Sequence, residues 1–261
     1  MLALIAGRGG LPAEVAKSQS TPPLICALEG FEPADVTADM VFRLEHLGAT
    51  LKRLQDAGVT DICLCGGIAR PVIDPSEIEP LTYALIPILS QAISAGDDGA
   101  LRAVMAIFET AGFKVRAAHD LAPGLLLRAG VQTSCAPDDQ MHADALRGDA
   151  LLAAIAALDV GQACVVGAGQ VWGVETVGGT EHMLRNLPEG VREARAILVK
   201  APKTGQDLRA DMPAIGPDTV DQLIDAGLVG MALTAGAALV LDRNEVARRA
   251  DAAGLVIWAR D

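Results

Sequence analysis

Short apolar runs alternate with helix-like stretches through residue 117, and this alternation is the feature that most limits the fold. The expected strands cover residues 2–6, 23–28, 61–65 and 113–117, and the expected helices cover residues 11–17, 45–57, 79–94 and 98–111. Strands that alternate with helices are typical of a parallel sheet covered by helices on both faces. We therefore predict an α/β fold that begins with a Rossmann-like, three-layer, nucleotide-binding domain over residues 1–133.

The pattern changes in the second half of the chain. A helix over residues 137–158 precedes two short strands, at 163–166 and 171–175, and the glycine turn between them is typical of a hairpin. Further strands are expected at residues 197–199, 230–233, 238–241 and 255–258, with helices at 219–226 and 243–253. This mixture predicts an α+β catalytic domain over residues 134–261.

Charge and composition exclude several classes of protein. The formal charge of −12 would repel a nucleic acid, and one Tyr and two Trp offer few stacking surfaces for single strands. No apolar run approaches the roughly 20 residues that a membrane span needs. The chain has no signal-peptide pattern, so we expect a cytoplasmic protein that does not bind nucleic acid.

The cysteines do not have the spacing of a zinc site. There are five of them: Cys26, Cys63, Cys65, Cys135 and Cys164. Cys63 and Cys65 lie two residues apart in an expected strand, so their side chains should point to one side of it, or lie in the core as small hydrophobic residues. The four histidines do not show metal-ligand spacing either.

Two glycine-rich segments follow expected strands of the first domain. Gly7, Gly9 and Gly10 precede Leu11 at the start of a helix, and Gly66 and Gly67 end the third strand. Backbone amides in such loops can hold a diphosphate, although a tight turn without a ligand explains the glycines equally well.

The first glycine segment also resembles an incomplete dinucleotide fingerprint. Pro12 stands where that fingerprint needs its third glycine, but Glu29 ends the second strand, as a ribose acceptor would. An NAD(P)-dependent oxidoreductase therefore stays an alternative, as does a non-catalytic nucleotide-sugar sensor.

A charged loop follows the expected strand at 197–199. Its three prolines, Pro202, Pro213 and Pro217, exclude a long helix. In an extended loop Asp207 and Asp211 would point to one side together with Arg209, and in a helical turn the two aspartates would still share a face. Converging carboxylates suit a divalent ion, or a water and an anionic substrate, whereas a solvated Asp–Arg pair is the simpler alternative.

Other polar residues lie at the ends of expected elements. Asp97 and Asp98 precede a helix and could cap it. Glu175 ends the second hairpin strand, and Thr180 is the expected N-cap of a helix after Gly178 and Gly179.

Five stretches together resemble one known family. They are residues 5–12, 65–71, 96–101, 174–184 and 199–217, and their spacing covers nearly the whole chain. They are similar to the bacterial UDP-2,3-diacylglucosamine pyrophosphatases of lipid A biosynthesis, the LpxI family. Arg8 and Glu181 depart from the residues expected at their positions, which are a small polar residue such as Asn, and Asp.

The resemblance implies hydrolysis of UDP-2,3-diacylglucosamine to 2,3-diacylglucosamine 1-phosphate and UMP, with Mg²⁺ as the cofactor and water attacking the β phosphorus. It implies catalytic roles for Asp211, Asp207, Lys200 and Arg209, with Asp211 and Asp207 as metal ligands. The implied substrate-binding residues are Gly7, Gly9, Gly10, Leu11, Gly66, Gly67, Arg70, Gly96, Asp97, Asp98, Glu175, Thr180, Lys203 and Gln206. It also implies a homodimer that contacts the inner face of the inner membrane.

Overall fold

The computed structural model describes all residues except 70–71, 95–96, 159, 203–206, 210–211 and 261, and the side chains of 91–98. The chain forms two compact units. The first comprises residues 1–124 with 207–211, and the second comprises residues 125–206 and 212–261. The division after Gly124 lies earlier than the predicted boundary at residue 133, because residues 130–131 pair with a strand of the second unit.

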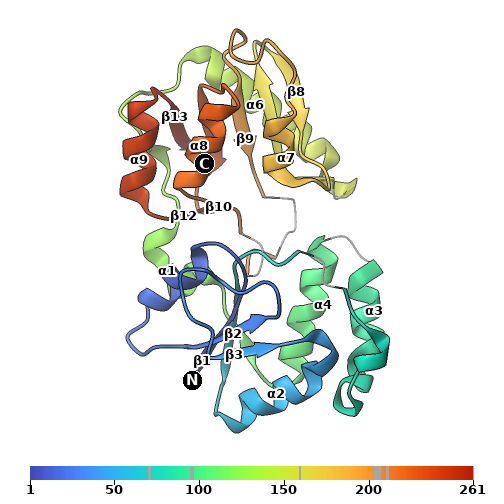
Figure 1. The fold of residues 1–261 in the computed structure, drawn as a ribbon. Helices are drawn as coiled ribbons and strands as arrows, with labels where there is room; N and C mark the ends of the chain where they lie inside the picture. The colour runs from blue at the N-terminus through green and yellow to red at the C-terminus, as the bar shows by residue number, and fades with distance from the viewer. Residues whose placement is uncertain (70–71, 95–96, 159, 203–206, 210–211, 261) are drawn as a thin grey trace. The chain divides into compact units, whose positions relative to one another are not determined.

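The first unit contains a parallel sheet flanked by helices, as predicted (Figure 1). Its strands are β1 (Leu2–Ala6), β2 (Leu24–Leu28), β3 (Met40–Phe42), β4 (Asp61–Cys65) and β5 (Lys114–Val115). Its helices are α1 (Leu11–Lys17), α2 (Leu47–Asp56), α3 (Ile86–Ser94), α4 (Asp97–Thr110) and α5 (Ala118–Leu121), with 3₁₀ turns at Leu44–His46, Pro75–Glu77, Pro80–Leu85 and Pro123–Leu125. The strand order β3-β2-β1-β4-β5 reverses direction at β1. Ligands of such sheets bind outside the carboxyl ends of the strands at this reversal.

The core of the first unit combines aliphatic and phenylalanine side chains on the face covered by α2 and α4. Ile5, Leu28 and Ile62 of the sheet pack there with Leu54 of α2 and Phe108 of α4, and all five are buried. Cys63 and Cys65 are also buried and lie on the other face of β4, so the predicted one-sided arrangement is confirmed.

The second unit is the predicted mixed α+β domain. Its six-stranded sheet has the order β6-β13-β11-β9-β7-β8, in which β9, β11 and β13 are parallel and β7 and β8 form the expected hairpin. The strands are β6 (Gly130–Val131), β7 (Ala163–Gly167), β8 (Gln170–Val174), β9 (Ile197–Lys200), β11 (Gly230–Thr234) and β13 (Val256–Arg260), and β10 (Ala214–Ile215) pairs with β12 (Leu239–Val240) separately. The helices are α6 (Asp139–Ile155), α7 (Gly179–Arg185), α8 (Pro217–Asp225) and α9 (Arg243–Ala252), with a 3₁₀ turn at Ala156–Leu158.

Alternate residues of β9 face different helices. Leu198 packs with Met183 of α7, whereas Val199 packs with Met141 of α6. Because side chains alternate along a strand, Lys200 lies on the same face as Leu198 and points toward the α7 layer. This alternation decides which polar groups Lys200 can reach.

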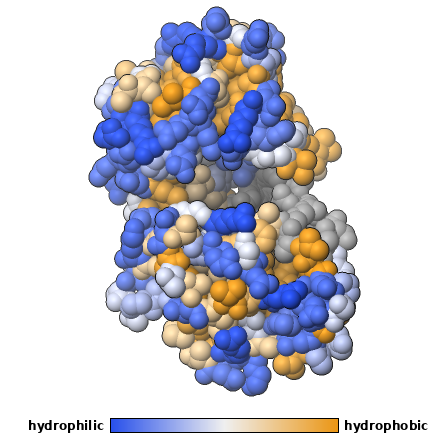
Figure 2. All heavy atoms as spheres, viewed as in Figure 1, coloured by the Kyte–Doolittle hydropathy of each residue, from blue (hydrophilic) through white to orange (hydrophobic). Residues whose placement is uncertain are grey.

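The surface is hydrophilic over most of the face in view, with apolar side chains in separate patches (Figure 2). Among the described residues, no helix is long and apolar enough to cross a bilayer.

Gly66 permits a close backbone contact at the carboxyl edge of the first sheet. Its φ is +90°, and an added Cβ would lie 2.6 Å from the Gly7 carbonyl oxygen. We expect Gly66→Ala to lower the free energy of unfolding by about 2–4 kcal/mol, because both the backbone conformation and the contact become unfavourable. Thermal and urea unfolding measure this loss.

Gly9 offers a matched control for this substitution. Its φ is +92°, but nothing lies within 4 Å of an added Cβ. Gly9→Ala should therefore cost only about 1 kcal/mol, from the backbone conformation alone. Equal losses in the two variants would show that the close approach of Gly7 adds nothing to the cost of a Cβ at Gly66.

Candidate active site

Three of the predicted site residues of the second unit are joined by hydrogen bonds. The Lys200 ammonium, at the carboxyl end of β9, donates to Thr180 Oγ1 over 3.2 Å. Thr180 donates in turn to Glu175 Oε1 over 2.6 Å. Lys200 is thus held at the end of a central strand, where a ligand would approach such a sheet.

Glu175 is buried, with only 8% of its surface exposed. Its second carboxylate oxygen, Oε2, accepts from the backbone amide of Gln162 over 2.9 Å. Because both carboxylate oxygens have partners, this group is stable inside the fold and is suited to orienting its neighbours. Thr180 is not the N-cap of α7, contrary to prediction, because the N-cap is Gly178, two residues earlier, and the helix begins at Gly179.

Asp207 and Arg209 pair with each other. Asp207 Oδ2 accepts from Arg209 Nη2 over 2.7 Å, and Asp207 Oδ1 accepts from the Arg209 amide and from Nε. Arg209 Nη1 also donates to Glu109 Oε1 of α4 over 2.7 Å. The hydrogen bonds from Arg209 hold the pKa of Asp207 below its ordinary value, so Asp207 stays ionised at neutral pH. These contacts place Asp207 and Arg209 with the first unit, whereas the sequence assigned them to the second domain.

The predicted metal ligands, Asp207 and Asp211, are described only in part, since Asp211 lies outside the described residues. No group of three or more His, Cys, Asp or Glu side chains among them could hold a metal ion. Both oxygens of Asp207 are already engaged by Arg209.

The two glycine segments of the first unit meet at the carboxyl ends of β1 and β4. The Gly7 amide donates to the Cys65 carbonyl over 2.8 Å, and Arg8 and Gly67 exchange two backbone hydrogen bonds of 2.9 Å. Gly10 is the N-cap of α1, and Leu11 is the first residue of that helix. The segments therefore meet at the sheet reversal, although the Gly7 amide is used within the fold.

Arg8 links the same edge to the loop after β2. Its guanidinium donates to the Gly30 carbonyl over 2.6 Å and lies 5.0 Å from the ring centre of Phe31. A small polar residue could not make both contacts, so this departure from the family pattern has a structural use in this chain.

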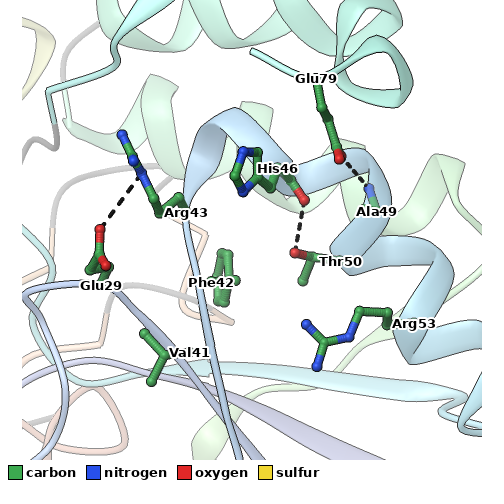
Figure 3. A pocket seen from close by; sticks show the side chains of 9 residues that line it. All are labelled: Glu29, Val41, Phe42, Arg43, His46, Ala49, Thr50, Arg53 and Glu79. Carbon is green, nitrogen blue, oxygen red and sulfur yellow. Dashed lines mark hydrogen bonds and ion pairs between the residues drawn. The ribbon is translucent and has the colours of Figure 1, made fainter. Parts of the chain in front are cut away.

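A pocket of about 310 Å³ opens at the ends of β2 and β3 (Figure 3). It is lined by Glu29, Val41, Phe42, Arg43, His46, Ala49, Thr50, Arg53 and Glu79. Arg43 lies 3.6 Å from Glu29, so the carboxylate proposed as a ribose acceptor already has a cationic neighbour. Glu79 accepts from the Ala49 amide over 2.6 Å and thereby satisfies the start of α2.

Several predicted site residues lie outside the described part of the chain. They are Arg70, Gly96, Lys203, Gln206 and Asp211. Asp97 and Asp98 begin α4, and the structure does not describe their side chains. Sequence reasoning missed Gln162 and Glu109, because their contacts join segments that no local pattern connects.

The fold defines an α/β protein, with a helix-flanked parallel sheet in the first unit and a mixed sheet in the second unit that presents Lys200 at a strand end. The LpxI N-terminal domain family matches residues 1–125, and the LpxI C-terminal domain family matches residues 128–258. The chain belongs to the LpxI family. It is 34% identical over 274 aligned residues to UDP-2,3-diacylglucosamine pyrophosphatase LpxI of Caulobacter vibrioides, an alignment that covers 100% of this chain and 97% of the relative.

Proposed function

We propose that this protein hydrolyses UDP-2,3-diacylglucosamine to 2,3-diacylglucosamine 1-phosphate and UMP, a step of lipid A biosynthesis. The observation that carries this function is the full-length similarity to a pyrophosphatase named for that substrate, with family matches in both halves of the chain. The protein is thus a hydrolase that acts on a nucleotide-sugar diphosphate.

The chemistry agrees with the presence of one oriented cationic side chain in each unit. A diphosphate accumulates negative charge on its oxygens as it is cleaved, so fixed cationic donors stabilise the transition state. Lys200 and Arg209 are the described candidates, and each is oriented by hydrogen bonds to neighbouring side chains. The glycine segments at the reversal of the first sheet are proposed to hold the nucleotide.

The direct test is incubation of the purified protein with UDP-2,3-diacylglucosamine, followed by mass spectrometry of both products. Formation of UMP and the lipid 1-phosphate in equal amounts supports the proposal. Binding without turnover would support the sensor alternative. Thermal stabilisation by NAD but not by UMP would support the oxidoreductase, which neither family match favours.

We propose that water attacks the β phosphorus, as the family resemblance implies. The new bond joins the water oxygen to this phosphorus, while the bond to the bridging oxygen breaks and UMP leaves with that oxygen. Hydrolysis in ¹⁸O-water should then place the label in the phosphate of the lipid product and none in UMP. Label in UMP would instead require attack at the α phosphorus.

Three further proposals rest on the same resemblance: a requirement for Mg²⁺, contact with the inner face of the inner membrane from the cytoplasm, and a homodimer. Chelation by EDTA followed by Mg²⁺ addition tests the first. Cosedimentation with lipid vesicles tests the second, and light scattering tests the third. Activity in EDTA would contradict the Mg²⁺ requirement. Absence from the vesicle pellet would contradict the membrane contact, and a monomeric mass would contradict the homodimer.

A further inference from the structure

The side chains around Lys200 form a closed chain of hydrogen bonds. Lys200 donates to Thr180, and Thr180 donates to Glu175. Glu175 accepts from the Gln162 amide, and the Gln162 carbonyl accepts from the amide of Ala201 over 3.1 Å. Since Ala201 directly follows Lys200, the series of hydrogen bonds ends on the peptide group next to the lysine from which it began.

The donor and acceptor roles in this series of hydrogen bonds are fixed. A threonine hydroxyl has one hydrogen, and a carboxylate can only accept, so Thr180 must donate to Glu175. Its oxygen lone pairs are then available to accept from the Lys200 ammonium. Glu175 therefore decides the direction of the hydroxyl, and the hydroxyl decides where the ammonium lies.

The backbone around Glu175 is also closely fitted. Its amide donates to the Ala163 carbonyl over 2.9 Å. A Cβ at Gly161 would lie 2.3 Å from the Glu175 carbonyl oxygen, so only glycine allows this approach. A buried carboxylate held this closely has little freedom to turn toward a ligand.

We propose that Glu175 and Thr180 are positioning residues that orient Lys200 and do not contact the substrate themselves. This inference rests on the proposed function only in assigning Lys200 to the phosphate groups. It changes the role that the family resemblance gave to Glu175 and Thr180, from substrate binding to control of one cation.

The first test compares Thr180→Val, which keeps the shape but removes the hydroxyl, with Thr180→Ser, which keeps the hydroxyl. We expect Thr180→Val to lower kcat/KM by about 10- to 100-fold, since a hydrogen bond to a charged group is lost. Thr180→Ser should stay within about threefold of the wild type, because its hydroxyl can make the same bonds. Glu181→Gln is the control, because Glu181 lies next in α7 but pairs with exposed Arg185.

A double-mutant cycle separates positioning from substrate contact. In the Lys200→Met background, Thr180→Val should have almost no further effect on kcat/KM, because the group that it orients is absent. The same fold-loss in both backgrounds would mean that Thr180 contacts the substrate directly, and would overturn the proposal. Thermal unfolding of each variant verifies that the fold is retained, and Thr180→Ala replaces Thr180→Val if that variant does not fold.

A second readout does not depend on activity. Acetic anhydride labels neutral lysine amines, and mass spectrometry gives the rate at Lys200 relative to Lys52, which is exposed and pairs with Asp56. Thr180→Val should raise the relative rate at Lys200, because the amine loses the hydroxyl that holds it in place. Unchanged labelling would overturn the positioning role. Increased labelling in a protein that does not cleave the diphosphate would leave the positioning role intact and refute the proposed function alone.

Discussion

Asp211→Asn should lower kcat for diphosphate hydrolysis by about 10²- to 10⁴-fold while leaving the protein folded, the range expected when a general base or a comparable catalytic carboxylate is removed. Asparagine keeps the size of the side chain and removes only the charge that a metal or an attacking water requires. The argument for Asp211 comes from the sequence, since Pro202 and Pro213 restrict the loop that carries it. Steady-state kinetics with UDP-2,3-diacylglucosamine measures the loss.

Two other aspartates sharpen this test. Asp207→Asn should act differently, because Asp207 accepts from Arg209 through both oxygens, and the substitution would leave the guanidinium paired with Glu109 alone. Asp218→Asn is the control, because Asp218 is exposed in the first turn of α8. Near-normal turnover in Asp211→Asn, with substrate binding unchanged, would remove Asp211 from the mechanism.

Lys200→Met should lower kcat by about 10²- to 10³-fold, the range found when one fixed donor to a developing negative charge is removed. Methionine preserves the apolar stem beside the α7 layer, so the expected loss is catalytic, and the thermal unfolding temperature should change little. Because the ammonium acts most strongly in the transition state, KM should change less than kcat. Kinetics at saturating and limiting substrate separates the two effects.

Two comparisons make the Lys200 result specific. Lys200→Arg keeps the charge but presents a planar fork that does not match the single Thr180 acceptor, so it should recover only part of the activity. Lys52→Met removes an exposed cation from α2 and should leave the kinetics unchanged. A rise in KM with kcat unchanged for Lys200→Met would mean that Lys200 contributes to binding and not to the chemical step.

The alternation of apolar runs predicted the larger elements because each of them buries a face of its own. It did not predict β3, β6 or β10, which have only two or three residues. Such short strands exist because a neighbouring strand supplies hydrogen bonds: β6 pairs with β13, and β10 pairs with β12. No local pattern in two residues can report a partner that lies far away in the chain.

The roles of the site residues stay predictions, and the hydrogen bonds that join three of them could not be predicted from the sequence. Lys200, Thr180 and Glu175 were selected because polar groups at strand ends and helix starts meet at one edge of a sheet. The order of their hydrogen bonds depends on which face of β9 carries Lys200, and that required the sheet order. The ion pair between Arg209 and Glu109 could not be predicted from the sequence, because the two residues lie 100 positions apart.

The division of the chain into units has a consequence for cutting the protein in two. Because residues 207–211 belong with the first unit, the polypeptide passes between the units three times, after residues 124, 206 and 211. A fragment that ends at Gly124 would leave Glu109 without Arg209, and the complementary fragment would carry a piece of surface belonging to the other half. The two halves are therefore interleaved parts of one polypeptide, and neither can be expressed whole as a single continuous segment.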